Sequence, residues 1–302
     1  MITILKCFII WLKTKLKPYV IDIKNAGEYF KALNFKAFIM FFKHPSFRVL
    51  PLMRIIVLKL DGKFYKQDKK LLLTIKNPEL TFVIKDAINI GQIAEVFWEL
   101  QYKFESKEED WTVIDIGANI GDTALYFANL ENVSIVHAFE PFRPTYQLAL
   151  ENLSLNKSAA QKIKLYNFGV SDRDYSCDIN FSSDISGCMT TSDDSRNAKL
   201  GLKKAVAETI YVKSISHLFK DILTPLPKNI LMKIDCEGEE YKIFPEMDKQ
   251  GFFKDVSVIM LEWHDGGTKP LLDILDKNSF ISFPLNGNLI FAVNTKMGEK
   301  RI

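Results

Sequence analysis

The stretch Val113-Ile114-Asp115-Ile116-Gly117-Ala118-Asn119-Ile120-Gly121-Asp122 decides the fold of this 302-residue chain. Its first residues are apolar and end in an acid, as a buried strand does, and small residues then lead into a helix. Gly117 and Gly121 permit a tight turn and let a ligand approach the backbone. Free amides at the start of the following helix favour an electron-rich group such as a carboxylate or phosphate. The stretch therefore predicts a strand, a ligand-binding loop and a helix.

A second acid follows the next predicted strand, in Ala138-Phe139-Glu140. A carboxylate at that place can accept hydrogen bonds from both ribose hydroxyls of a nucleoside-containing cofactor. A dinucleotide fingerprint would require glycines where Asn119 and Asp122 stand, so that class of cofactor is disfavoured. The order Asp-x-Gly-x-x-x-Gly is instead the form found in S-adenosylmethionine-dependent methyltransferases.

Strand and helix signals alternate along the rest of the chain. Strands are predicted at 112–116, 134–139, 163–168, 208–212, 229–234 and 257–262, and helices at 120–130, 141–155, 215–223, 239–249 and 270–276. Residues 171–201 are polar and suggest short strands with a mobile loop. At the end, strands over 280–284 and 289–293 flank Asn286-Gly287, which predicts a hairpin. A run of βα units predicts a parallel sheet, to which the hairpin adds an antiparallel strand.

The first third of the chain has a different character. Residues 1–43 suggest helices, short strands are expected at 54–60, 71–75 and 80–85, and a helix at 90–104. We therefore divide the chain into a basic, aromatic helical segment (1–60), a short-strand and helix extension (61–109) and a cofactor-binding domain (110–302).

Composition supports a globular protein with an uneven charge distribution. The chain is 47% hydrophobic and 25% charged, which excludes a disordered tail, a collagen-like repeat and a small disulfide scaffold. Residues 1–60 hold eleven basic and two acidic residues, and the remainder holds 29 basic and 35 acidic residues. The basic segment is either a set of helices packed on the domain or a surface for an anionic membrane or a lipid-linked acceptor.

Apolar run length and cysteine spacing indicate the cellular compartment. No apolar run approaches the roughly 18 residues of a membrane-spanning helix. The four cysteines form no C-x-x-C pair and are expected to be reduced thiols. We expect a cytoplasmic protein, with membrane-surface association as an open alternative.

A third motif identifies a family. The segment Leu231-Met232-Lys233-Ile234-Asp235-Cys236-Glu237-Gly238-Glu239-Glu240 ends the fourth strand of the alternating region and matches the pattern K-I-D-x-E-G-x-E. With the two acid-ended strands and Glu262-Trp263-His264, it resembles the FkbM-type methyltransferase family over about residues 112–283. One departure is Ser214-Ile215-Ser216, where the family usually has T-L-D, and we assign no function to that segment.

The resemblance implies a fold and a cofactor site. The fold class would be α/β, a Rossmann-like class I methyltransferase sheet of seven mostly parallel strands with a C-terminal antiparallel hairpin and an N-terminal helical and short-strand extension. The cofactor would be S-adenosylmethionine, with Glu140 holding the ribose and Ser171 and Asp172 near the adenine. Asp172 could equally be a turn-capping acid. The predicted cofactor set around the methionine part is Asp115, Gly117, Ala118, Asn119, Gly121 and Asp122.

The catalytic candidates lie at the ends of later strands, where ligands of open α/β sheets bind. Asp235, Glu237 and His264 could each take a proton from a hydroxyl acceptor. Alternatively, Asp235, Glu237 and Glu262 could gather a divalent cation that polarises the hydroxyl. Glu239 and Glu240 are interpreted as helix N-terminal acids.

The leading functional hypothesis is O-methylation of a hydroxyl on a sugar, glycolipid or other small metabolite. One alternative is a non-catalytic scaffold with a methyltransferase-like body. Another is nucleic-acid or protein methylation through the basic segment. Nucleic acid is disfavoured because the basic residues alternate with Phe, Ile and Leu, and because no Asn/Asp-Pro-Pro-Tyr segment occurs.

Overall fold

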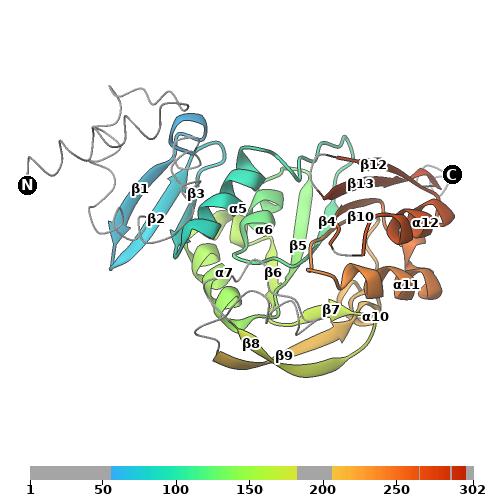
Figure 1. Ribbon diagram of the computed structural model, residues 1–302. Coiled ribbons are helices and arrows are strands. Elements are labelled where there is room, and N and C mark those ends of the chain that lie inside the picture. Colours follow the sequence, from blue (N-terminus) through green and yellow to red (C-terminus); the bar gives the residue numbers. More distant parts are fainter. Residues whose placement is uncertain (1–55, 182–205, 265, 286–287, 297–302) are drawn as a thin grey trace, which may run out of the picture.

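The computed structural model describes residues 56–181, 206–264, 266–285 and 288–296. The largest sheet in this part of the chain has seven strands in the order β12-β13-β11-β10-β4-β5-β6 (Figure 1). Its strands are β4 (Trp111–Ile116), β5 (Val133–Phe139), β6 (Ile163–Tyr166), β10 (Asn229–Ile234), β11 (Val258–Glu262), β12 (Phe280–Pro284) and β13 (Leu289–Asn294). The predicted class of fold is confirmed by this order.

Pairing within this sheet is parallel except at the hairpin. Strands β10, β11, β4, β5 and β6 pair in parallel, whereas β13 runs antiparallel to both β11 and β12. The chain builds outward from β4 through β5 to β6, and then from β10 through β11 on the other side. The carboxyl ends of β4 and β10 therefore flank the point where the strand order reverses, which is where such sheets bind ligands.

Helices cover both faces of this sheet (Figure 1). One face carries α5 (Ala87–Phe97), α6 (Asp122–Ala128), α7 (Arg143–Leu155) and α8 (Lys157–Ala160). The other carries α10 (Ile215–His217), the π-helix η2 (Leu218–Ile222), α11 (Glu240–Gln250), the 3-10 helix η3 (Phe252–Asp255) and α12 (Lys269–Lys277). Strand β4 is buried throughout because Val113 joins the first apolar cluster, and Ile114 and Ile116 join the second.

The extension forms a small antiparallel sheet of β1 (Lys63–Gln67), β2 (Lys70–Ile75) and β3 (Leu80–Ile84). Two asparagine side chains in and just after α7 bind the edge strand β3 of this small sheet. The N–H of Val83 donates to Oδ1 of Asn152 at 2.8 Å, and the N–H of Thr81 donates to Oδ1 of Asn156 at 2.8 Å. These amide side chains accept hydrogen bonds from backbone N–H groups that would otherwise lack a partner at the junction.

Several local predictions in the extension are wrong. Residues 56–59 are helical rather than extended, and the N–H groups of Leu60 and Gly62 both donate to the carbonyl of Ile56. A short apolar run does not distinguish a helix from a strand. The tight turn between β1 and β2 is Asp68-Lys69, where both residues have positive φ. The helix predicted at 90–104 ends at Phe97, beyond which Leu100 adopts φ 55°.

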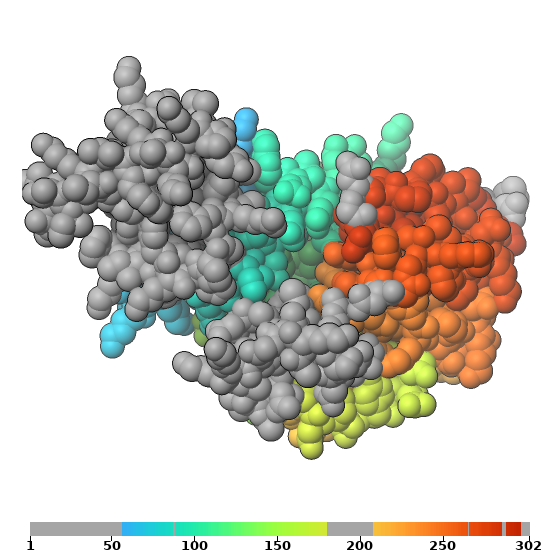
Figure 2. Space-filling view, in the orientation of Figure 1, coloured from blue at the N-terminus to red at the C-terminus, as the bar shows by residue number. Residues whose placement is uncertain are grey.

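A third sheet lies at the lower edge of the molecule, where β8 is yellow-green in Figures 1 and 2. It comprises β7 (Gly169–Ser171), β9 (Val206–Ser214) and β8 (Tyr175–Phe181) in the order β7-β9-β8. Most of the polar loop predicted at 171–201 lies outside the described residues, as do Cys188, the helices predicted at 1–43 and residues 1–55 of the basic segment. Within the described ranges, helices are too short or too polar to cross a membrane.

The loop after β4 approaches the end of β10 so closely that only glycine fits at position 117. Gly117 has φ +83°, and a Cβ there would lie 1.8 Å from the carbonyl oxygen of Asp235. At Gly121, φ is +80° and a Cβ would meet the side chain of Leu153 at 3.2 Å. Both positions therefore require glycine because of neighbouring protein atoms, whether or not a ligand is bound.

We predict that Gly117→Ala lowers the free energy of unfolding by about 3 kcal/mol or more, since it adds a backbone clash to a strained φ. Gly251→Ala is the matched control: its φ is +71°, but no atom lies within 4 Å of the added Cβ. That variant should cost only the strain of the left-handed conformation, about 1–2 kcal/mol. Urea denaturation measures both, and equal costs would contradict the close approach.

Candidate active site

A buried lysine lies at the centre of the site. Lys233 is on β10, and its side chain is only 2% exposed. Its Nζ donates to the carbonyl oxygen of Gly117 at 2.7 Å, and lies 3.3 Å from Oδ1 of Asp115 and 3.5 Å from Oδ2 of Asp235. Burial by itself lowers the pKa of Lys233, but the carboxylates of Asp115, Asp235 and Asp122 outweigh it and raise the pKa above its usual value. The lysine therefore stays charged.

The residues around the lysine complete this ionic centre. Asp115 is fully buried, and its Oδ2 accepts the hydroxyl of Thr123 at 2.7 Å. Burial raises the pKa of Asp122 to about 6, although Lys233 opposes the shift. From the extension, the ring of Tyr102 lies 5.5 Å from Lys233 Nζ, within cation–π range. The centre thus joins β4, β10 and the extension.

A pocket opens beside this centre, at the carboxyl ends of β4, β5 and β10. Five of the residues predicted to form the site line it: Gly117, Asn119, Glu140, Asp235 and Glu237. Its remaining walls come from the ends of β4 and β5, from β7 and β9, and from the segment after β10, with Ile116, Phe139, Pro141, Phe142, Gly169, Val170, Val212, Cys236 and Glu239. The pocket is therefore largely apolar with a few carboxylates, as nucleoside sites commonly are.

Glu140 is held firmly at the wall of the pocket. Its Oε2 accepts the N–H of Asn119 at 3.0 Å and its Oε1 accepts the N–H of Phe142 at 2.9 Å. Burial raises the pKa of Glu140 to about 7, against the effect of these two amides. Each carboxylate oxygen has a second lone pair, so the side chain can still accept hydrogen bonds from a bound molecule.

Other predicted cofactor residues do not line the pocket. Asp115, Ala118, Gly121 and Asp122 are buried beneath it. Ser171 is also buried, and its hydroxyl donates to Glu239 and lies 3.1 Å from Oδ1 of Asp172. The placement of Ser171 and Asp172 near an adenine remains a prediction.

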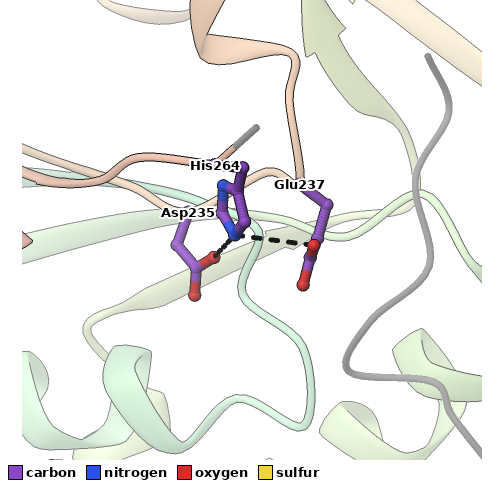
Figure 3. Close-up of side chains that lie close together, drawn as sticks. All are labelled: Asp235, Glu237 and His264. Carbon is purple, nitrogen blue, oxygen red and sulfur yellow. Dashed lines mark ion pairs between the residues drawn. The ribbon is translucent and has the colours of Figure 1, made fainter. Parts of the chain in front are cut away.

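The three catalytic candidates do come together. Asp235 and Glu237 follow β10, His264 follows β11, and Figure 3 shows the three side chains converging. His264 Nε2 lies 3.5 Å from Oε2 of Glu237 and 3.8 Å from Oδ1 of Asp235. Each residue offers one ligand atom within 4.8 Å of the others. Glu262, which could have been a cation ligand on sequence grounds, is not in this group.

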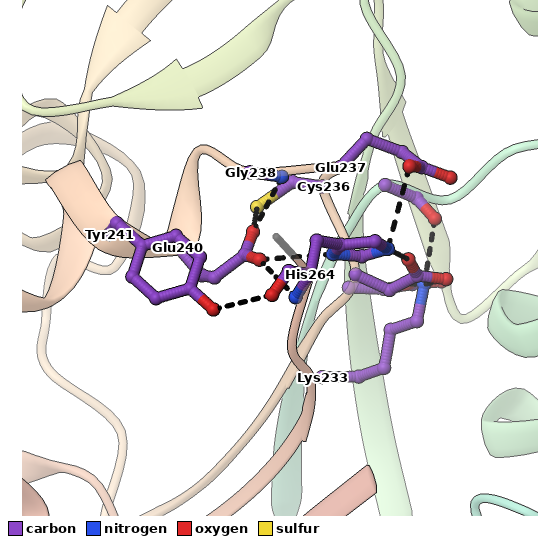
Figure 4. A network of polar contacts seen from close by, with 10 residues as sticks. Lys233, Cys236, Glu237, Gly238, Glu240, Tyr241 and His264 are labelled. Atoms are coloured by element: carbon purple, nitrogen blue, oxygen red, sulfur yellow. Dashed lines mark hydrogen bonds and ion pairs between the residues drawn. The ribbon is translucent and has the colours of Figure 1, made fainter. Parts of the chain in front are cut away.

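The first turn of α11 fixes His264 (Figure 4). Glu240 Oε1 accepts the backbone N–H of His264 at 2.9 Å and lies 3.0 Å from its Nδ1. The hydroxyl of Tyr241 donates to the carbonyl of His264 at 2.8 Å. The other oxygen of Glu240 accepts the N–H of Gly238 at 2.9 Å. The position of Glu240 in the sequence predicts only a helix-terminal role, since no local signal links it to a residue 24 positions later.

Neighbouring charges determine the protonation of the histidine. Burial lowers the pKa of His264, but the hydrogen bond to Glu240 and the charges of Glu237, Glu240 and Asp235 raise it to about 9 overall. Glu262 ends β11 next to Asp235, and burial together with that carboxylate raises the pKa of Glu262 above its usual value. The site therefore concentrates negative charge around one imidazole.

Removing the buried lysine should destabilise the fold. We expect Lys233→Met to lower the free energy of unfolding by about 3–5 kcal/mol, because it leaves buried carboxylates without their cation. The control Lys213→Met removes an exposed ion pair with Asp174, in which the two charged atoms lie 2.8 Å apart. Its cost in unfolding free energy should stay below about 1 kcal/mol. Chemical denaturation compares them, and a Lys233→Met protein as stable as the control would contradict the central role of the lysine.

Known methyltransferases are similar to this chain. The methyltransferase sdnD of Sordaria araneosa is 22% identical over 201 residues, which cover 60% of this chain and 77% of that protein. Methyltransferase 1 of Beauveria bassiana is 25% identical over 166 residues, which cover 52% of this chain and 66% of that protein. The methyltransferase FkbM structure from Methylobacillus flagellatus KT matches 67% of this chain and 47% of its own, at 16% identity and a TM-score of 0.41.

The family assignment rests on a sequence match that spans the site. The profile described as methyltransferase FkbM domain matches residues 115–281, more than half of the chain. That range begins at the buried Asp115 and includes Glu140, Lys233, Asp235 and His264. The chain therefore belongs to the FkbM methyltransferase family.

Proposed function

We propose that this protein transfers a methyl group to a hydroxyl of a sugar, a glycolipid or another small metabolite. The observation that carries the proposal is the convergence of Asp235, Glu237 and His264 beside the pocket. A hydroxyl is a weak nucleophile until it loses its proton, and the carboxylates of Asp235 and Glu237 can accept one. His264, whose raised pKa of about 9 keeps it protonated at neutral pH, pairs with both carboxylates. Since Asp235 and Glu237 line the pocket, this supports a proton acceptor next to the reacting atoms.

The pocket fits the cofactor that the family implies. S-adenosylmethionine, when bound, supplies an electrophilic methyl group. Glu140 lines the pocket and retains acceptor capacity beyond its two amide contacts, and most other lining residues are apolar, which suits a ribose attached to a base. Asp235, Cys236, Glu237 and Glu239 line the same pocket. The same segment thus borders the pocket and contributes two of the three catalytic candidates.

Positioning accounts for the rest of the proposed chemistry. The acceptor oxygen forms the new bond to the methyl carbon as the carbon–sulfur bond breaks, and the hydroxyl proton passes to the cluster. Strands β10 and β11 pair in the core of the sheet, and α11 holds His264 at both its backbone and its ring. Such fixed geometry can provide much of the acceleration of a bimolecular transfer.

Cofactor affinity should depend on the protonation of Glu140. Since burial raises the pKa of Glu140 to about 7, the carboxylate is ionised above that pH and protonated below it. The ionised form accepts hydrogen bonds from hydroxyls at both oxygens. We therefore expect S-adenosylhomocysteine to bind about tenfold more weakly at pH 6 than at pH 8 in calorimetric titration.

Glu140→Gln serves to assign that pH dependence. The variant should bind S-adenosylhomocysteine weakly at both pH values and lose the difference between them. A wild-type affinity that does not change between pH 6 and pH 8 would contradict the role of Glu140. A difference that persists in Glu140→Gln would assign the titration to another group.

His264 should affect methyl transfer without affecting cofactor binding. We expect His264→Gln to reduce kcat/KM about 100-fold or more, because the variant loses the imidazole that positions the proton-accepting carboxylates of Asp235 and Glu237. Transfer of a labelled methyl group to a panel of hydroxyl-bearing sugars and glycolipids provides the measurement. His217→Gln is the control, because His217 pairs with Asp221 at 2.7 Å on the exposed side of η2. Equal rates in the two variants would contradict the proposed site.

A further inference from the structure

The side-chain cluster has the spacing of a metal site. His264 Nε2 lies 3.5 Å from Glu237 Oε2 and 3.8 Å from Asp235 Oδ1 (Figure 3). Hydrogen bonds between such atoms are typically about 2.7–3.2 Å long, so both separations are wider than direct bonding needs. Two ligand atoms that share an ion at about 2.1 Å lie about 3.0–3.8 Å apart, depending on the angle between them. Both separations from His264 thus match those of atoms that share an ion, and the ligand atoms of all three residues lie within 4.8 Å of one another.

The orientation of His264 is an independent indication. Glu240, whose side chain is fully buried, lies 3.0 Å from Nδ1 and so turns Nε2 toward the two carboxylates (Figure 4). A histidine that binds a metal usually donates its other ring N–H to a carboxylate or carbonyl, which fixes the tautomer and the ring. The imidazole is 8% exposed, so this orientation is held inside the protein.

Charge also favours a cation here. The nearby Lys233 is already engaged by Asp115, by the carbonyl of Gly117 and by one oxygen of Asp235. The carboxylate of Glu237 adds further negative charge beside His264. The side chain of Asp235 is 30% exposed, so an ion and a substrate oxygen can reach the gap from solvent.

We propose that Asp235, Glu237 and His264 together bind one divalent cation whose open positions receive the acceptor hydroxyl. This inference rests on the proposed methyl transfer to a hydroxyl. A set of two carboxylates and one imidazole suits Mn²⁺ or a similar ion, and three protein ligands leave room for substrate oxygen. In this case the three side chains would hold the cation instead of taking the proton. Coordination would lower the pKa of the bound hydroxyl, and its proton would pass to water as the oxygen attacks the methyl carbon and the carbon–sulfur bond breaks.

The test uses Mn²⁺ and the full chain, without any acceptor. Loss of the electron paramagnetic resonance signal of free Mn²⁺ on titration should show one saturable site per chain. We expect Glu237→Gln and His264→Gln each to weaken that binding at least tenfold. Asp273→Asn is the control, since Asp273 pairs with Lys269 on an exposed face of α12, and it should bind Mn²⁺ like the wild type.

The outcomes separate this inference from the proposed function. Absence of saturable binding at millimolar Mn²⁺, or equal binding by the variants and the wild type, would overturn the metal site. In that case methyl transfer that continues in chelator-treated protein would leave the proposed function standing. Saturable, variant-sensitive Mn²⁺ binding without transfer to any hydroxyl would instead support the metal site and count against the proposed acceptor.

Discussion

The site depends on a single buried charge. Lys233 lies inside the sheet, and Asp115, Asp235 and the carbonyl of Gly117 surround its Nζ. A buried ammonium is tolerable only when paired and hydrogen bonded. Because β4 and β10 pair in register with Asp115 opposite Lys233, the sheet itself supplies the pairing. The loop that borders the pocket is held to the Lys233 ammonium by the hydrogen bond that the carbonyl of Gly117 accepts.

A second constraint acts from the other side of the sheet. Helix α11 begins at Glu240, two residues after Gly238, so the segment that follows the lysine leads into the helix that holds His264. Glu237 adopts φ 54° and Gly238 φ 112°, a sharp turn that places Glu237 beside the imidazole. One ten-residue segment therefore carries the buried cation, one wall of the pocket and two of the three converging side chains.

Much of this arrangement could be predicted from the sequence. Parallel strands that end in acids leave those acids at one edge of the sheet, and this rule is enough to group Asp235, Glu237 and His264. The buried roles of Lys233 and Glu240 could not be predicted, since they depend on partners 116 and 24 residues away. The structure of the extension could not be predicted either. Its short apolar segments do not distinguish helix from strand, and an uncommon Asp68-Lys69 turn sets the register of β1 and β2.

The central claim is that the pocket and the polar cluster are two halves of one methyl-transfer site. A crystal structure of the full chain with S-adenosylhomocysteine tests it most directly. The ribose hydroxyls should contact Glu140, and the sulfur should face Asp235 and His264, where the acceptor would lie. A ligand bound elsewhere, or a sulfur directed away from these side chains, would show that the pocket and the cluster do not form one site.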